Sequence, residues 1–272
     1  MFPARSPVLK AMPSELLDPD KIKANLKTRC IGRKILVFSS TSSTNDIAAE
    51  YAKNTENDGL AVFAEEQSAG RGRAGAKWHS NRAESILCSI VLAGSNMGAE
   101  LLCLTCAVAV AEAIGKAGSA QAKIKWPNDI MLNGKKVAGI LIESNPADTG
   151  NTYVIGIGIN CHQRKESFPA ELQSITTSID LESQTVCDRI ALAKRLLTSV
   201  DYWLEAAIDA SQKVIEQWRN LSVQLGHRIT LLYNGRRFAG NCIGIDPDKG
   251  LILQMDTGGV RMFDAAHTRI LK

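Results

Sequence analysis

Short apolar runs bounded by polar and glycine-containing turns recur through the first part of the chain, a pattern typical of β-strands. They predict strands over residues 34–38, 59–65, 85–92, 122–126, 129–132, 136–143 and 152–159. Asn133 and Gly134 separate two of these runs, and an Asn-Gly pair between apolar runs is a strong signal for a tight hairpin. We therefore predict a sheet that contains a β-hairpin.

Helical periodicity occupies several of the remaining segments. Residues 98–116 carry apolar side chains on nearly every face, which predicts a helix in the core. Residues 187–220 place their apolar side chains on one stripe, which predicts a single long amphipathic helix. Shorter helices are predicted over 20–27 and 47–52, the second after a polar cluster with helix-capping side chains. Strands in runs with helices between them indicate an α+β fold, a mixed central sheet flanked by helices.

The pattern changes near Gly226, where short strands and turns replace the helices. We predict strands over 227–233, 237–245, 250–255 and 260–264, separated by Asn-Gly, Asp-Pro and Gly-Gly turns. Such a segment is typical of a small β-barrel. We therefore divide the chain into an N-terminal extension (1–33), a main domain (34–225) and a C-terminal barrel domain (226–272).

The net charge and the length of the longest apolar stretch give limited information about binding partners. The formal net charge is +4, and lysine and arginine residues are spread along the chain without a basic run. This distribution favours a small anionic ligand, such as a phosphate, over a nucleic acid. The apolar stretch 101–111 is too short to span a bilayer, which needs about twenty residues. The N-terminus has no signal-peptide core, so we expect a soluble protein without a membrane partner.

The seven cysteines show no disulfide-like spacing, and most of them lie in apolar segments. An odd number of scattered cysteines favours a reduced, cytoplasmic setting. Cys103 and Cys106 form a C-x-x-C pair inside the predicted core helix, and no second Cys or His pair lies nearby in the sequence. We interpret them as packed helix residues and not as a zinc or redox pair.

The most unusual segment is the glycine–arginine loop, residues 67–78. Its three glycines match the G-x-G-x-x-G dinucleotide fingerprint, but polar loop residues and a strand follow where that fingerprint needs a helix, which argues against a Rossmann fold. The glycines allow the backbone to approach a ligand closely, and Arg71 and Arg73 add two positive charges. The loop therefore suits a phosphate or a carboxylate, although a flexible surface turn could have the same composition.

Three further segments bring polar groups close to predicted strands. Lys125-Trp-Pro-Asn-Asp129 places a cation, an aromatic side chain and a carboxylate around a proline turn. Lys136 enters an otherwise apolar strand; a lysine there is usually solvated, but beside two arginines it could bind an anion. Gly156 and Gly158 leave room for a ligand to lie against the backbone of their strand.

Together with Ser43-Thr-Asn45, these segments resemble the biotin–protein ligase family. The matching motifs occur in the family's order: 43–45, Gly70-Arg-Gly-Arg73 with Trp78, 125–129, Lys136-x-x-Gly-Ile-Leu-x-Glu143 and Gly156-Ile-Gly-Ile-Asn160. One such match would be weak, but five in order are specific. The resemblance runs from about residue 34 to the C-terminus. It implies a class II synthetase-like catalytic domain followed by an SH3-like barrel.

The resemblance also implies a role for each motif. The residues implied to bind biotin are Ser43, Thr44, Asn45, Gln67, Arg71, Gly72, Arg73 and Lys136, with Lys136 on the carboxylate. Those implied to bind ATP or the adenylate are Arg71, Arg73, Trp78, Asn128, Lys136 and Asn160. Asp129 would help to hold Mg²⁺. Ala74 and Ala76 stand where many relatives have further arginines, so the closed loop has fewer cations to hold the intermediate.

The implied reaction needs no protein nucleophile. ATP would convert the biotin carboxylate to biotinyl-5′-AMP, and a lysine of a biotin carboxyl carrier protein would attack this mixed anhydride. Arg73, Lys136 and Mg²⁺ are expected to stabilise charge on the phosphoryl oxygens. A free lysine amine has a pKa near 10.4, so a base should remove its proton, and Asp129 is the candidate.

Several alternatives share parts of this pattern. Some relatives are also repressors with a winged helix-turn-helix ahead of the ligase domain, but the 33 residues before the first predicted ligase strand are too few for it, so we expect no DNA binding. The retained cations and Asp129 disfavour a biotin sensor without catalysis. A lipoate-type ligase shares the fold, but the glycine–arginine loop and the 125–129 turn favour biotin. Relatives often pair through exposed strands, and the apolar strand 152–159 predicts a homodimer formed in this way.

Overall fold

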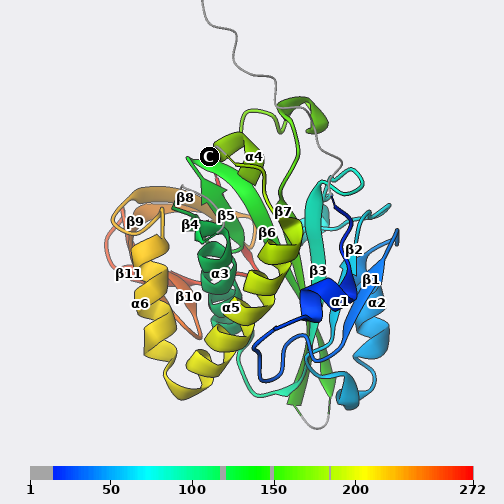
Figure 1. Ribbon diagram of the computed structural model, residues 1–272. Coiled ribbons are helices and arrows are strands. Elements are labelled where there is room, and N and C mark those ends of the chain that lie inside the picture. The colour runs from blue at the N-terminus through cyan, green and yellow to red at the C-terminus, as the bar shows by residue number, and fades with distance from the viewer. Residues whose placement is uncertain (1–14, 117–120, 148–149, 184, 272) are drawn as a thin grey trace, which may run out of the picture.

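The computed structural model describes residues 15–116, 121–147, 150–183 and 185–271. Two sheets organise this part of the chain, one of seven strands and one of five (Figure 1). The large sheet has the order β1-β2-β3-β7-β6-β5-β4. β1 and β2 are parallel, and the other neighbouring strands are antiparallel. The sheet is therefore mixed, and the predicted α+β class is confirmed.

The elements of the main domain follow the predicted segments closely. Its strands are β1 (Ile35–Phe38), β2 (Ala61–Ala64), β3 (Ser85–Ser95), β4 (Lys123–Lys125), β5 (Asp129–Leu132), β6 (Lys135–Ala147) and β7 (Gly150–Asn160). Its helices are α2 (Thr44–Tyr51), α3 (Ala99–Gly115), α4 (Ile179–Glu182), α5 (Arg189–Asp209) and α6 (Ser211–Leu221), and α1 (Pro19–Lys23) precedes it in the N-terminal extension. α2 begins at Thr44 and not at Ile47, because the Ser43 hydroxyl caps the helix by accepting the Asn45 amide at 3.3 Å.

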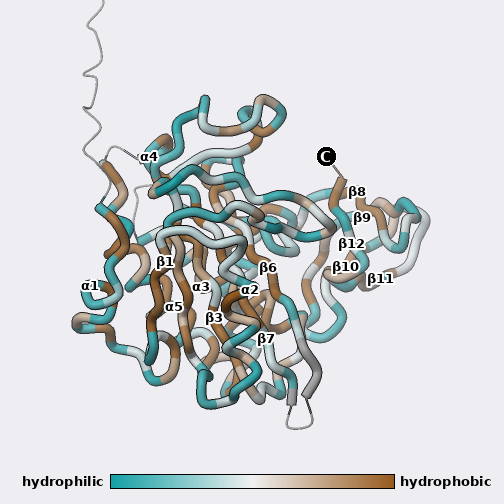
Figure 2. The backbone as a smooth tube through the Cα atoms, turned by 90° about the vertical axis from the view of Figure 1, so that its right-hand side faces the viewer, coloured by the Kyte–Doolittle hydropathy of each residue, from teal (hydrophilic) through white to brown (hydrophobic). Residues whose placement is uncertain are grey.

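Alternation along the strands sends side chains to two faces of the large sheet. On one face, alternate residues of β3 and β7, such as Ile86, Ile90 and Ile157, pack under α3 and α5. On the other face, Val91 and Val154 pack against α2. Figure 2 shows the hydrophobic segments gathered around the sheet and α3, with hydrophilic loops at the periphery. The face under α2 continues over the glycines of β7, and the candidate site is built there.

One predicted helix is wrong in its length. Residues 187–220 form two helices, α5 and α6, because the chain breaks at Ala210, whose φ of −155° and ψ of 76° are not helical. α5 and α6 both pack against α3, and α6 also reaches the barrel strand β9 (Arg236–Asp246). Each helix buries an apolar stripe, so the apolar pattern alone shows no break between them.

The C-terminal sheet has the small-barrel character that its turns predicted. Its strands are β8 (Arg228–Tyr233), β9, β10 (Gly250–Met255), β11 (Val260–Phe263) and β12 (Thr268–Ile270), in the order β11-β10-β9-β8-β12. All of its pairings are antiparallel. Gln224, two residues before the boundary at Gly226, anchors the chain just before it enters this sheet, because its side chain bonds both the backbone amide (2.6 Å) and the carbonyl (3.2 Å) of Trp126. The barrel therefore lies beyond the β4 edge of the large sheet, on the left in Figure 1.

The predicted route to a homodimer is wrong. β7, which contains the apolar segment 152–159, lies in the middle of the large sheet. One of its edges is hydrogen-bonded to β3 and the other to β6, so it offers no free edge to a second copy. The homodimer itself stays a prediction.

Candidate functional site

The glycine–arginine loop connects β2 to β3 beside the glycine-containing strands. No helix follows Trp78, so the dinucleotide fingerprint is excluded, as the sequence predicted. The loop has internal hydrogen bonds: the Gly72 amide donates to the Ala76 carbonyl at 2.7 Å, and the Trp78 amide donates to the Gly70 carbonyl at 3.0 Å. At its tip, Ala74 and Gly75 have positive φ values of 51° and 77°. Ala74 therefore adopts a conformation that costs an L-residue energy, and the internal bonds help to hold it.

Trp78 anchors the end of the loop on the sheet. Its indole ring lies on the backbone of Gly158 and Gly139, where a Cβ atom would come within 2.6 Å and 3.2 Å of the ring. The two glycines therefore make the space that the ring occupies. The indole Nε1 is buried and has no hydrogen-bond partner among the described residues, so this donor is left unsatisfied within the described part of the protein.

Lys136 lies beside this ring at the start of β6. Its ammonium is 5.9 Å from the centre of the Trp78 ring and 2.5 Å from Asp129 Oδ1. Both side chains of the ion pair are about one-third exposed, at 33% and 27%. An arriving carboxylate or phosphate can therefore compete with Asp129 for the lysine.

Arg73 joins the loop to the neighbouring turn and to the barrel. Its guanidinium donates to Asn128 Oδ1 at 3.4 Å and also to the backbone carbonyl of Ala265. Asn128 is held in turn, because its amide donates to the Ile140 carbonyl at 2.9 Å. The structure thus brings Arg73, Asn128, Asp129 and Lys136 together, as the motifs predicted. The barrel contact adds a neighbour that the motifs do not contain.

Arg71 lies on the α2 side of the loop, between two carboxylates. Its Nη2 is 2.6 Å from Asp46 Oδ1 and 3.5 Å from Glu143 Oε1. The hydrogen bond from Arg71 lowers the pKa of Asp46 despite partial burial, and the same bond raises the pKa of Arg71. All three side chains are about 40–45% exposed, so solvent weakens this cluster and a ligand anion can draw Arg71 away.

Ser43, Thr44 and Asn45 stand at the N-terminus of α2 and are buried. The amide and hydroxyl of Thr44 both donate to Gln67 Oε1, at 2.7 and 2.9 Å. The Asn45 Nδ2 donates to Glu143 Oε2 at 2.7 Å. Both bonds to Gln67 go to its oxygen, and among the described residues its Nε2 has no hydrogen-bond partner. Gln67 is partly exposed, so this nitrogen is the side-chain amide donor of the group that is left for a ligand.

Two motif residues, Asn160 and Trp126, lie apart from the side chains grouped around the glycine–arginine loop. Asn160 is 2% exposed; its amide donates to the Thr177 carbonyl at 2.9 Å and its oxygen accepts from Gln163 at 3.3 Å. Its role as an adenylate ligand stays a prediction, because its observed partners are structural. Trp126 is fully buried in the core. The aromatic side chain beside Lys136 is therefore Trp78 and not the one in the 125–129 turn.

Sequence reasoning missed three contributors to the site. Ser89 interrupts the apolar run 85–92, which is the one signal that could have singled it out. Asp46 was visible only as part of a polar cluster before a helix. Ala265 gave no signal, because it acts through its backbone carbonyl and lies 192 positions from Arg73 in the sequence.

Metal binding rests on Asp129 alone. Among the described residues, no three His, Cys, Asp or Glu side chains are grouped to hold a metal ion. Mg²⁺ commonly binds through one or two carboxylates together with substrate phosphates and water. Asp129 could serve in that way only in the company of ATP phosphates, so its metal role stays a prediction.

The C-x-x-C pair has the structural role that the sequence predicted. Cys103 and Cys106 lie one turn apart on α3, both unpaired, and Cys106 is fully buried. Burial raises the pKa of Cys103 to about 12. At neutral pH this thiol is therefore protonated and is a poor metal ligand or nucleophile.

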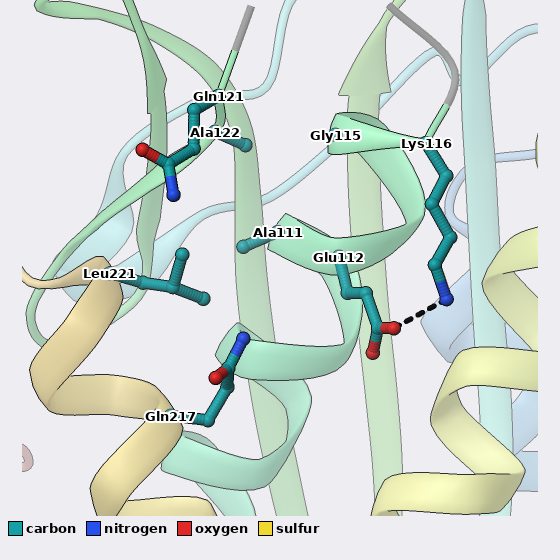
Figure 3. Close-up of a pocket in the computed structure, with 8 residues that line it drawn as sticks. All are labelled: Ala111, Glu112, Gly115, Lys116, Gln121, Ala122, Gln217 and Leu221. Atoms are coloured by element: carbon teal, nitrogen blue, oxygen red, sulfur yellow. Dashed lines mark hydrogen bonds and ion pairs between the residues drawn. The ribbon is translucent and has the colours of Figure 1, made fainter.

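A cavity of about 350 Å³ lies on the opposite side of the sheet, between α3 and α6 (Figure 3). Its charged lining residues are Glu112 and Lys116, which form an ion pair. Glu112 also accepts a hydrogen bond from Trp203 Nε1 at 2.5 Å. Because these groups are satisfied within the protein, the cavity is a weak candidate for a catalytic site.

Sequence comparison agrees with the motifs. The profile of the biotin/lipoate A/B protein ligase family matches residues 37–160. The bifunctional ligase/repressor BirA of Bacillus subtilis is 32% identical over 253 residues, which cover 92% of this chain and 78% of that protein. The biotin–[acetyl-CoA-carboxylase] ligase of Paracoccus denitrificans is 31% identical over 231 residues, which cover 82% and 95% of the two chains.

Structural comparison gives the same fold. The biotin protein ligase of Aquifex aeolicus in complex with biotin and ATP has a TM-score of 0.76 and 22% identity, covering 88% of this chain and 99% of that chain. The mixed sheet with its C-terminal barrel and its cationic loop defines a ligase of the biotin and lipoate type. The chain belongs to the biotin protein ligase family.

Proposed function

We propose that this protein activates biotin with ATP as biotinyl-5′-AMP and transfers it to a lysine of a biotin carboxyl carrier protein. The observation that carries the proposal is the gathering of Lys136, Arg73 and the 128–129 turn beside Trp78 on a glycine-lined sheet face. Relatives support the choice of substrates, since one is a biotin–[acetyl-CoA-carboxylase] ligase and another was solved with biotin and ATP.

The first half-reaction must turn a poor acyl donor into a reactive one. The biotin carboxylate attacks the α-phosphorus of ATP, a mixed anhydride with AMP forms, and pyrophosphate leaves. Negative charge develops on the phosphoryl oxygens, and positioned cations stabilise it. In this proposal Lys136 binds the carboxylate and Arg73 brings a second cation from the loop. The contacts of Lys136 with Asp129 and of Arg73 with Asn128 support these roles. Mg²⁺ bound with the ATP phosphates would neutralise further charge there.

The second half-reaction transfers the biotinyl group to an amine. The carrier lysine attacks the anhydride carbonyl, AMP leaves, and the nitrogen must lose a proton. Asp129 is the proposed acceptor of that proton. Its carboxylate is 27% exposed and pairs with Lys136 at 2.5 Å, so it is accessible once the ligand engages the lysine.

Mass spectrometry of a biotin carrier domain incubated with this protein, biotin and MgATP tests the proposal directly. We expect one biotinyl group on one lysine, and no modification without ATP. Modification by lipoate in place of biotin would show a lipoate-type ligase. Biotin binding without ATP–pyrophosphate exchange would show a sensor that has lost catalysis.

Arg73→Ala is expected to let biotinyl-AMP escape from the site. Loss of one charge-assisted contact should raise the release rate of the intermediate about ten- to hundredfold while the chain still folds. Released adenylate would biotinylate lysines of an unrelated protein, which a blot detects. Arg82→Ala is the matched control, because Arg82 is exposed and follows the loop. Retention of the intermediate equal to that of the parent would show that Arg73 does not hold it.

The cytoplasmic location is part of the same proposal. Within the residues that the structure describes, no helix has the length and apolar character to cross a membrane. The homodimer and the lack of DNA binding stay predictions from the sequence.

A further inference from the structure

Ser89 lies at the centre of a buried hydrogen-bond network that underlies the proposed biotin site. It stands in the middle of β3, opposite Val62 of β2 and Gly156 of β7, and has no exposed surface. A buried hydroxyl in a central strand costs energy unless it is hydrogen-bonded. Ser89 Oγ is 2.5 Å from Asn45 Oδ1 and 2.7 Å from Thr44 Oγ1, so both of its partners belong to the first turn of α2.

The contact with Asn45 determines which way that amide points. The Ser89 hydroxyl can only donate to Asn45 Oδ1, because an amide oxygen has no proton. The amide nitrogen must then face the other way, where it donates to Glu143 Oε2 at 2.7 Å. Gly156 makes the space, since a Cβ atom there would lie 2.4 Å from Asn45 Oδ1. Glu143 in turn lies 3.5 Å from Arg71 of the loop.

The contact with Thr44 has a parallel effect on Gln67. Ser89 Oγ also donates toward Thr44 Oγ1 at 2.7 Å, so its one proton is shared between Asn45 and Thr44. The proton of the Thr44 hydroxyl is then free to go to Gln67 Oε1. The Thr44 amide and hydroxyl lie within 2.9 Å of Gln67 Oε1 and fix the oxygen end of that amide. The nitrogen end of Gln67, a donor, is therefore the end left for a ligand.

We propose that Ser89 is a positioning residue for ring recognition: through Thr44 it presents Gln67 as a fixed donor to a ligand ring that carries a hydrogen-bond acceptor. The inference rests on the proposed function and deepens it. The ring of biotin is a cyclic urea with a carbonyl acceptor, whereas the dithiolane ring of lipoate has only sulfur atoms, which are weak acceptors. A donor fixed in advance favours the urea, because the bond forms without the entropy cost of ordering the amide.

Ser89→Ala tests this role. Isothermal titration calorimetry should show the Kd for biotin rise about tenfold, the size expected for one lost buried hydrogen bond. In ATP–pyrophosphate exchange the KM for biotin should rise by the same factor. The KM for ATP and kcat should stay within about twofold, because Lys136 and Arg73 do not contact this network and Arg71 meets it only through the exposed 3.5 Å contact with Glu143. Inhibition by added lipoate should not weaken.

Ser85→Ala is the matched control. Ser85 is a fully buried serine on the same strand and the same face, but its hydroxyl bonds Ser80 (2.9 Å) and Gln163 (2.5 Å) instead of α2. We expect its biotin Kd to match that of the parent. If Ser89→Ala does not fold, Ser89→Cys serves in its place, since a thiol is close in size and only a weak donor.

The outcomes separate the inference from the proposed function. An unchanged biotin Kd in Ser89→Ala, or equal losses in biotin KM, ATP KM and kcat, would overturn the positioning role while the ligase activity stands. An equal rise of the biotin Kd in Ser85→Ala would also overturn the positioning role, because the effect would then come from the strand and not from the hydrogen-bond network. A parent protein that binds no biotin by calorimetry would contradict the proposed function, and the inference with it.

Discussion

Arg189→Met is expected to lower the free energy of unfolding by about 3–5 kcal/mol, because it leaves a buried carboxylate without its cation. Arg189 begins α5, and its Nη1 is 2.8 Å from Glu65 Oε2, with the two side chains only 1% and 2% exposed. The same guanidinium donates to the carbonyls of Ser85 (3.1 Å) and Glu15 (2.7 Å). The Arg189 side chain thus joins α5 to three segments: the residue that follows β2, the start of β3 and the N-terminal segment.

Urea unfolding followed by tryptophan fluorescence measures this effect. Glu50→Gln is the control, because it breaks an ion pair, Lys53–Glu50, whose side chains are about 70% exposed. That change should cost no more than about 0.5 kcal/mol, since water screens an exposed pair. A loss below about 1 kcal/mol in Arg189→Met would show that the buried pair contributes no more than a surface contact.

Lys136→Ala is expected to have the largest effect on the reaction itself. Lys136 should contact the biotin carboxylate in the bound substrate and the acyl phosphate in the transition state, so the substitution should both weaken biotin binding and slow adenylation. Loss of one charge-assisted contact costs about 1.5–3 kcal/mol, or roughly ten- to hundredfold in each affected step. Asp129 would also lose its partner at 2.5 Å, which adds an uncompensated negative charge beside the phosphates.

Calorimetry gives the biotin Kd of this variant, and ATP–pyrophosphate exchange gives the adenylation rate. Lys135→Ala is the matched control, because the neighbouring lysine on β6 is exposed. We expect Lys135→Ala to behave as the parent in both assays. If Lys136→Ala keeps the parent's adenylation rate at saturating biotin, Lys136 acts in substrate binding alone and Arg73 must carry the transition-state charge.

Local pattern was sufficient for most elements of the fold. Asn133 and Gly134 form the predicted hairpin turn between β5 and β6, with φ values of 47° and 79°. A type I′ two-residue turn requires positive φ at both positions, which an Asn-Gly pair readily adopts. α3 was predicted as a core helix because its sequence is apolar on nearly every face, and it is buried between the sheet and the helices α5 and α6. These features follow from residue type and spacing, which are properties of neighbours in the sequence.

The sequence by itself determined the strands, the α+β class, the C-terminal barrel and the motif residues that gather at the site, because each depends on local periodicity or on a short motif. The tertiary structure alone decided which strands are neighbours, and so placed β7 in the middle of the sheet and not at an edge. It also decided that Trp78 and not Trp126 lies beside Lys136, and that Arg73 reaches Ala265 and Ser89 reaches α2. The physical reason is the same in each case: these contacts join segments far apart in the chain, and the free energy that selects them comes from packing and hydrogen bonding in the folded protein.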